Sequence, residues 1–220
     1  YPLTKSDKAS NALICAELEK VTLQFPIISE ENKEIPYETR KNFETHWLVD
    51  PLDGTKEFIK RNGEFTVNIA LVHQHKTSLG VVYIPCREEL FWAVKGQGAL
   101  LEKDDKEIQI QAADFRITDK NLKVVCSRSH LNEETQAFIE KLAEPDMVAR
   151  GSSLKFLTIA QGAAHIYPRL GPTMEWDTGA AQIILEEAGG SVISQETQAP
   201  LLYNKENLRN PHFIAYGNIQ

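Results

Sequence analysis

The sequence predicts a protein of the α/β (α+β) class, and three observations support that prediction. The first half of the chain, residues 1–120, has the pattern of strands separated by tight turns, preceded by a helix. In the second half, residues 121–220, apolar strands alternate with amphipathic helices. The composition, with 42% hydrophobic and 25% charged residues, is typical of a globular chain that buries a sizeable core. We therefore expect an α+β half and an α/β half that meet near residue 120.

The first elements are predicted to be a helix and two short strands. Apolar residues recur at helical spacing over residues 6–24, which predicts an amphipathic helix. Two short apolar runs follow, and they predict strands at residues 27–28 and 46–50. The second of these strands is expected to end at Asp50, in a tight turn that also contains Asp53.

The middle of the chain has the pattern of a sheet built from hairpins. Apolar and polar residues alternate along it, as they do in strands with one buried face. Polar residues 74–76 and the Gly-Gln-Gly of residues 96–98 indicate turns. We expect the charged stretch over residues 102–107 to be a solvated loop. The predicted strands cover residues 65–73, 77–85, 89–101 and 106–111, and the last of them is expected to be an edge strand.

Strands and helices alternate in the second half, which predicts a largely buried sheet. The last helix is predicted to begin at Asp177 and to stop at Gly189 and Gly190, because glycine readily adopts the left-handed conformation that ends a helix. The other predicted elements are strands at residues 122–127 and 163–168 and helices at residues 133–143 and 152–161.

Charge and composition exclude several classes of function. A net charge of -7 argues against nucleic-acid binding, which needs a basic surface, but permits a small anionic substrate bound through a metal. Cys15, Cys86 and Cys126 are widely spaced, which is typical of reduced thiols in the cytoplasm rather than of a disulfide framework. No apolar run approaches the roughly 20 residues of a transmembrane helix, and no signal peptide is visible. The chain starts at Tyr1, so we expect upstream residues to be missing.

Four acidic residues are predicted at the ends of strands or helices, where sheet proteins place their sites. Each of three has a simpler interpretation: Glu30 as a surface charge, Asp50 as a turn residue before proline, and Asp177 as a helix cap. Asp50 and Asp53, however, are separated by only two residues. Like charges this close destabilise each other unless a cation lies between them.

The turn from Asp50 to Thr55 offers ligands for a hard divalent cation. It supplies two carboxylates, the backbone carbonyl of Leu52 and, just beyond, the Thr55 hydroxyl to orient a water molecule. An EF-hand is excluded because the turn lacks ligands at alternate positions and lacks the distal glutamate. Oxygen ligands suit Mg2+, which retains water molecules for substrate and nucleophile. The sequence therefore predicts a magnesium site.

Four segments resemble the motifs of the inositol monophosphatase superfamily. "DPLDGT" at residues 50–55 is similar to its D-P-[IL]-D-G-T motif, and "WDTGAAQIILEEAGG" at residues 176–190 is similar to its second signature. "SEE" at residues 29–31 and "TKSD" at residues 4–7 match two further elements in the right order. The resemblance covers essentially the whole chain. It implies the layered α-β-α-β-α sandwich of the sugar-phosphatase type, with the family's N-terminal helix missing upstream.

The same resemblance implies roles for the acidic residues. Asp7 would act through a bound water molecule, Glu30 and Thr55 would orient the attacking water, and Asp50 would complete the catalytic set. Phosphoryl transfer depends on positioning and charge neutralisation, so no Ser, Cys or His nucleophile is required. The groups implied to hold two or three Mg2+ ions are Glu30, Asp50, the Leu52 carbonyl, Asp53 and Asp177.

Within the superfamily, the second half of the chain is most similar to the CysQ-type 3'(2'),5'-bisphosphate nucleotidase branch. Inositol monophosphatases have an alanine-rich segment where this chain has "GSSLKF" at residues 151–156. A second phosphate on the substrate requires cationic and hydrogen-bonding groups away from the metals. The residues expected to contact substrate are Glu30, Leu52, Asp53, Gly54, Thr55 and Asp177 near the metals, and Ser127, His130, Ser153, Lys155 and Arg169 beyond them. Surface charge is the alternative for the last two, and a helix-start position is the alternative for His130.

The resemblance thus predicts a Mg2+-dependent phosphatase that removes the 3'-phosphate of 3'-phosphoadenosine 5'-phosphate, or of its sulfated form, in sulfur assimilation. An inositol- or sugar-phosphate phosphatase of the same superfamily and a catalytically silent metal-binding or scaffold protein remain alternatives. The expected partner is the small nucleotide substrate, and binding to nucleic acid is not expected. No transmembrane segment is expected, and a homodimer is the oligomeric state considered. The implied location is the cytoplasm, with peripheral association with the inner membrane also implied by the family.

Overall fold

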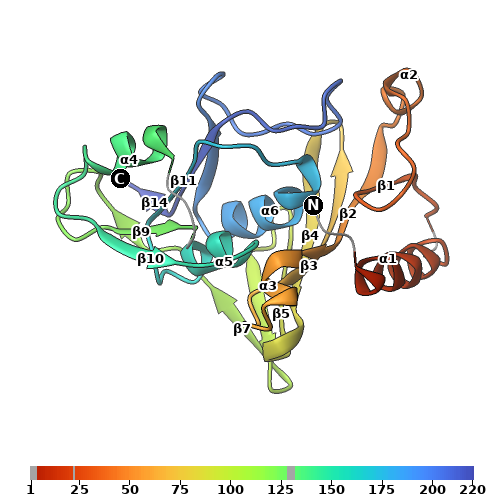
Figure 1. The fold of residues 1–220 in the computed structure, drawn as a ribbon, viewed down its shortest axis with the longest axis horizontal. Coiled ribbons are helices and arrows are strands. Elements are labelled where there is room, and N and C mark those ends of the chain that lie inside the picture. The colour runs from red at the N-terminus through yellow and green to blue at the C-terminus, as the bar shows by residue number, and fades with distance from the viewer. Residues whose placement is uncertain (1–3, 22, 128–131) are drawn as a thin grey trace.

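The computed structural model describes residues 4–21, 23–127 and 132–220, which form alternating layers of helix and sheet (Figure 1). Helix α1 lies at one side, next to a seven-stranded sheet. Helices α5 and α6 separate that sheet from a five-stranded sheet, and helix α4 covers the far side. The α/β class predicted from the sequence is confirmed. The helices are α1 (Lys5–Leu18), α4 (Glu133–Ile139), α5 (Leu154–Ala160) and α6 (Gly179–Glu187).

The seven-stranded sheet takes its strands in chain order, and the predicted hairpins are confirmed. The turn between β3 and β4 consists of Gln74 and His75, which both have positive φ, as a two-residue hairpin turn requires. The first pair of strands is parallel and all the others are antiparallel. The strands are β1 (Ile27–Ser29), β2 (Thr45–Asp53), β3 (Thr66–His73), β4 (Lys76–Ile84), β5 (Glu89–Val94), β6 (Ala99–Lys103) and β7 (Lys106–Ile110), the last at an edge as predicted.

The charged stretch over residues 102–107 is a hairpin, so its prediction as a loop is wrong. Glu102 pairs with Glu107 in the ladder between β6 and β7, and only Asp104 and Asp105, both at positive φ, form the turn. Every residue of the stretch is exposed. Charged side chains suit this position because strands at the rim of a sheet can keep both faces in water and thereby resist pairing with another chain.

The five-stranded sheet combines parallel and antiparallel strands in the order β10-β9-β11-β13-β12. The sequence predicted β9 and β11 but missed its other three strands, as well as the short helices α2 (Tyr37–Arg40) and α3 (Thr55–Ile59). Predicted helices are shorter than expected, and α1 ends at Leu18. No helix in the described part of the chain has the length and apolar character needed to cross a bilayer. The strands are β9 (Lys123–Cys126), β10 (Asp146–Ala149), β11 (Ile166–Arg169), β12 (Ser191–Ser194) and β13 (Phe213–Tyr216), with β8 (Asp114–Phe115) and β14 (Asn218–Ile219) forming a separate pair.

Helix α6 is the central element of the core, and every residue from Gly179 to Leu185 is buried. Strand β4 approaches this helix very closely at Gly80. A Cβ at this position would lie 2.4 Å from the Ala180 carbonyl oxygen and 2.6 Å from Cγ2 of Ile183. Only glycine permits that approach, because real Cβ atoms essentially never lie so close to other heavy atoms. The helix that follows Asp177 is thus seated directly on the sheet that carries Asp50.

Gly80→Ala is expected to destabilise the protein, because the new methyl group must push α6 away from β4. Overpacking of this kind typically costs about 1–3 kcal/mol, and urea unfolding would measure the loss. Gly171→Ala is the matched control, since a Cβ there meets nothing nearer than Nδ2 of Asn132 at 3.9 Å. Equal stability of the two variants would contradict the close packing of α6 on the sheet.

Candidate metal and active site

Asp50 and Asp53 lie on strand β2, which runs three residues further than predicted. Residues three apart in a regular strand point to opposite faces of the sheet. Here the ladder shifts register between the two aspartates, so that Asp50 pairs with Asn68 and Asp53 with Thr66. Such a bulge re-aims a side chain. As a result, both carboxylates reach the same side of the strand, although the expected simple turn after Asp50 is absent.

Asp177 comes from the other side of the site, and it does not cap α6, which was the simpler interpretation of this residue. It ends a short 3-10 turn, η2 (Glu175–Asp177), and its Oδ2 accepts a hydrogen bond of 2.8 Å from the Met174 N–H. Thr178 holds the cap position of α6 and makes no side-chain cap bond. The helix does stop as predicted, with Gly189 at φ +94. Asp177 is therefore held by its own turn, which leaves it directed at β2.

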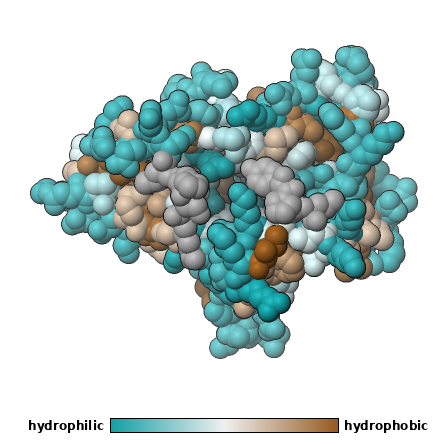
Figure 2. Space-filling view, viewed as in Figure 1, coloured by the Kyte–Doolittle hydropathy of each residue, from teal (hydrophilic) through white to brown (hydrophobic). Residues whose placement is uncertain are grey.

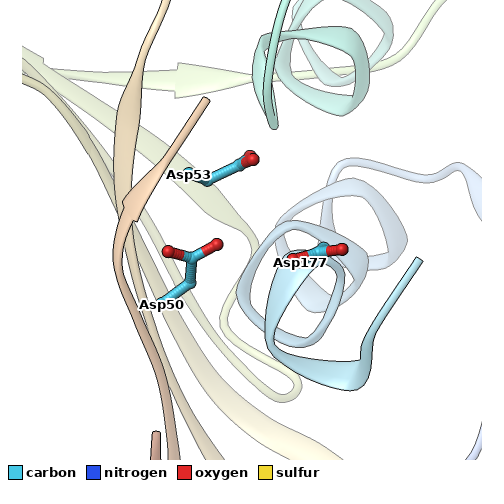
Figure 3. A group of neighbouring side chains, drawn as sticks. All are labelled: Asp50, Asp53 and Asp177. Atoms are coloured by element: carbon cyan, nitrogen blue, oxygen red, sulfur yellow. The ribbon is translucent and has the colours of Figure 1, made fainter. Parts of the chain in front are cut away.

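The carboxylates of Asp50, Asp53 and Asp177 converge on one point (Figure 3). One oxygen of each lies within 4.8 Å of the others. Hydrogen-bond donors of the protein orient the carboxylates of Asp50 and Asp53. The Leu52 N–H lies 3.0 Å from Asp50 Oδ1, and the Ser152 and Ser153 hydroxyls lie 2.6 and 3.0 Å from Asp53 Oδ2. The sequence-predicted cluster is thus assembled, with oxygens oriented for a shared ligand.

Burial and mutual repulsion shift the protonation of this cluster. Asp50 is 1% exposed, and burial, followed by the charges of Asp53 and Asp177, raises its pKa well above the ordinary value. Burial and the Asp53 charge raise the pKa of Asp177 to about 7. A divalent cation would reverse these shifts by favouring the charged carboxylates. The donor set, made only of oxygens, fits a metal ion of the Mg2+ type.

Glu30 lies beside the three aspartates rather than among them. It follows β1, and its N–H donates a hydrogen bond of 3.2 Å to the Val49 carbonyl, which ties it to β2. Its side chain lines the cavity described below and stays open to solvent on that side. Partial burial, then the charges of Glu31 and Asp53, raises its pKa to about 7. Glu30 therefore belongs to the same electrostatic cluster.

Asp7 and Thr55 form a pair at the edge of this cluster. Asp7 is buried near the start of α1, where its Oδ2 accepts a hydrogen bond of 2.7 Å from the Thr4 N–H and its Oδ1 lies 3.2 Å from the Thr55 hydroxyl. Thr55 begins α3, directly after Gly54, which has φ +90. The positive φ of Gly54 lets the chain turn from the strand into the helix at this point. The prediction that Asp7 reaches the site is consistent with this contact.

A cavity of about 650 Å³ extends from the carboxylates. Three residues expected to contact substrate, Ser127, Lys155 and Arg169, line it. Ser153 instead contacts Asp53, and His130 lies outside the described residues. The lining that the sequence analysis missed includes Arg150, Ser152 and Tyr167. Two of these had a weak signal, because Ser152 adjoins Ser153 and Tyr167 precedes Arg169 by two residues, on the same face of a strand.

Lys155 is not a surface charge, since it is 8% exposed. Its Nζ donates a hydrogen bond of 2.7 Å to the Ser152 carbonyl and lies 5.5 Å from the centre of the Tyr167 ring. Burial lowers the pKa of Lys155 to about 8, against the opposing effect of Asp53. An ammonium group held in this way is preorganised to meet an anion in the cavity.

Comparisons with known proteins agree with this geometry. The model of the inositol monophosphatase family matches residues 1–215. The 3'(2'),5'-bisphosphate nucleotidase CysQ of Salmonella typhimurium (strain LT2) is 43% identical over 212 residues, which cover 96% of this chain and 84% of that protein. The crystal structure of CysQ from Bacteroides thetaiotaomicron has a TM-score of 0.88 at 41% identity and covers 97% of this chain and 84% of its own. The inositol monophosphatase from Anabaena (Nostoc) sp. PCC 7120 has a TM-score of 0.74 at 27% identity and covers 97% of this chain and 80% of its own.

Proposed function

This chain belongs to the inositol monophosphatase family, and we propose that it is a metal-dependent phosphatase acting on a nucleotide bisphosphate. The substrate would be 3'-phosphoadenosine 5'-phosphate or its sulfated form, with the 3'-phosphate removed to leave AMP or APS. The observation that carries this proposal is one cavity lined by groups of both charges. Carboxylates line part of it, and Lys155, Arg169 and Arg150 also line it.

Such a cavity suits a molecule with two phosphates better than one with a single phosphate. The phosphate at the carboxylate end needs metal ions to offset the repulsion of Asp50, Asp53 and Asp177. The other phosphate can be held by Lys155 and Arg169 through charge-assisted hydrogen bonds. A substrate with only one phosphate would leave the buried Lys155 ammonium without an anion. Relatives of this chain that are named as bisphosphate nucleotidases support this choice.

Mg2+ is the proposed metal, with two or three ions bound. Such ions lower the pKa of an attacking water molecule and neutralise the leaving oxygen of a phosphate ester. The groups proposed to hold them are Glu30, Asp50, the Leu52 carbonyl, Asp53 and Asp177.

Thr55 and Asp7 would orient the attacking water. The Thr55 hydroxyl donates its hydrogen to Asp7 Oδ1, at 3.2 Å. Its oxygen is then left as an acceptor, so that it can take a hydrogen bond from the water and direct the lone pair of that water toward phosphorus. Glu30, at the mouth of the same cluster, would take the other hydrogen bond from the water. Asp7 contributes by holding the Thr55 hydroxyl in this orientation.

The direct test is to measure phosphate release from 3'-phosphoadenosine 5'-phosphate and from inositol 1-phosphate, each with and without Mg2+. The proposal expects Mg2+-dependent release mainly from the first substrate. Preference for inositol 1-phosphate would favour an inositol- or sugar-phosphate phosphatase instead. A lack of release from both substrates would favour a silent metal-binding protein.

Lys155→Ala is expected to raise KM for 3'-phosphoadenosine 5'-phosphate more than it lowers kcat. The contact with the uncleaved phosphate is made equally in the ground state and in the transition state, and losing such a contact weakens binding without slowing chemistry. A hydrogen bond to a charged group is worth about 1.5–3 kcal/mol, or about 10- to 100-fold in kcat/KM. Adenosine 3'-monophosphate lacks that phosphate, so its hydrolysis should change little.

The control for this variant is Lys120→Ala, because the side chain of Lys120 is exposed and pairs with Glu144 on the surface. It should leave both substrates unaffected. An unchanged ratio of kcat/KM between the two substrates in Lys155→Ala would show that Lys155 does not hold the second phosphate.

Three broader features are also proposed on the family resemblance. The reaction would serve sulfur assimilation in the cytoplasm, with peripheral association with the inner membrane, and the protein would act as a homodimer. Sedimentation velocity at micromolar concentration would test the homodimer directly.

A further inference from the structure

Tyr167 is a buried tyrosine whose hydroxyl has no hydrogen-bond partner among the described residues. The residue is 3% exposed, and its ring packs edge-on against Phe156 at 5.3 Å and Phe213 at 6.0 Å between ring centres. Buried tyrosines usually pair their hydroxyl group. The Tyr167 hydroxyl is also open to solvent to some extent. It differs in this from the unpaired polar atoms that are fully buried, such as Nε1 of Trp47. Tyr167 also lines the cavity, so a hydroxyl that is open to solvent can meet a ligand there.

Strand geometry places this hydroxyl beside the cationic groups of the cavity. Tyr167 and Arg169 are two residues apart on β11 and therefore point to the same face of the sheet. Ile166 points to the opposite face, into the smaller core cluster with Val124. Lys155 reaches over the Tyr167 ring from α5, with Nζ 5.5 Å from the ring centre. The Tyr167 ring thus lies under an ammonium group and on the same face of β11 as a guanidinium group.

The electrostatic surroundings of the phenol keep it a donor. Burial is the main cause that raises the pKa of Tyr167 far above its ordinary value, against the lowering effect of Arg169. The hydroxyl therefore stays protonated at neutral pH. A neutral O–H on a face that also carries Lys155 and Arg169 is suited to donate to an anion that both cations attract.

We propose that the Tyr167 hydroxyl donates a hydrogen bond to the substrate phosphate that is not cleaved, and so helps to select bisphosphates over monophosphates. This inference rests on the proposed function and adds a specificity-determining residue to it. The phosphate that reacts is a less suitable acceptor for the Tyr167 hydroxyl, because it must bind at the carboxylates. The second phosphate is attracted by Lys155 and Arg169, which lie on the same side of β11 as Tyr167.

Tyr167→Phe tests the proposal with the loss of a single O–H group. The ring contacts with Phe156 and Phe213 and the position under Lys155 are retained, so the fold should be preserved. We expect kcat/KM for 3'-phosphoadenosine 5'-phosphate to fall about 10-fold or more, mainly through KM. Hydrolysis of adenosine 3'-monophosphate should be unchanged. Calorimetry should show a matching loss of affinity for adenosine 5'-monophosphate, which carries only the uncleaved phosphate.

Tyr203→Phe is the matched control. Tyr203 is as deeply buried as Tyr167, but its hydroxyl donates a hydrogen bond of 2.6 Å to Oε1 of Gln182 inside the core. This variant should lower Tm without changing the ratio of kcat/KM between the two substrates. An unchanged ratio in Tyr167→Phe, or an equal loss for both substrates, would overturn the proposal. A wild-type protein that does not hydrolyse 3'-phosphoadenosine 5'-phosphate at all would overturn the proposed function, and with it this inference.

Discussion

Asp50→Asn is expected to abolish turnover while the fold stays intact. Asp50 is the most buried of the acidic groups at the site, and the charges of Asp53, Asp177 and Glu30 all act on it. Its carboxylate is proposed to help hold the metal ions, and an amide oxygen would neutralise them poorly. Removing one preorganised electrostatic group typically costs about 10²–10³-fold in kcat, and loss of this buried charge should cost at least that. Steady-state phosphate release measures the effect.

The same variant should be more stable than the wild type when no metal is present. Asn keeps the oxygen that accepts the Leu52 N–H, at 3.0 Å from Asp50 Oδ1 in the wild type, but removes a buried carboxyl whose charged form is repelled by its neighbours. In the folded wild type, Asp177 and Glu30 keep their protons up to about pH 7. In the unfolded chain the same carboxyl groups lose their protons at lower pH. Stability without metal therefore falls as the pH rises through that value.

Thermal unfolding in a chelating buffer at about pH 6 and pH 8 would measure this effect. The variant should melt higher than the wild type at pH 8 and should lose less Tm between the two pH values. Asp146→Asn is the control, since Asp146 is exposed on strand β10, the edge strand of the other sheet. Turnover near the wild-type rate in Asp50→Asn would show that Asp50 does not hold the metal ions.

Removal of divalent metal is expected to abolish activity in the wild type, and Mg2+ should restore it. The proposed ligands are carboxylates and one carbonyl, which suit Mg2+, with Mn2+ as a substitute. Ca2+ should inhibit, because it accepts longer and more variable coordination and so binds without the compact geometry that the reaction needs. The measurement is phosphate release after dialysis against a chelator, followed by the return of each ion separately.

A binding measurement separates metal affinity from catalysis. Mg2+ should raise Tm of the wild type, since a ligand at about 100 times its dissociation constant stabilises the folded state by about 2.7 kcal/mol. The increase should be largely lost in Asp50→Asn and kept in Asp146→Asn. Activity that survived exhaustive chelation would require a mechanism without metal ions.

The sequence by itself determined which residues could form a metal site and most of the strands around it. Asp50 and Asp53 stand next to an apolar run, and Asp177 follows a tryptophan at the start of a helical pattern, so their grouping followed from motif and spacing. The hairpins were also local, because alternation and turn residues are encoded within a few positions of each other. The helix stop at Gly189 had the same local origin.

The tertiary structure alone decided how those residues face one another. The bulge in β2 brings Asp50 and Asp53 to one side, and a 3-10 turn rather than a helix cap directs Asp177 at them. Lys155 is buried above Tyr167 because α5 packs on β11. The local sequence pattern of either segment contains no information about this contact. Sequence periodicity indicates which face of its own helix or strand a residue occupies. The distance between two elements depends instead on how closely they pack, and the contact of α6 with Gly80 is an example. For that reason the acidic cluster could be predicted from sequence, and the position of Tyr167 under Lys155 could not.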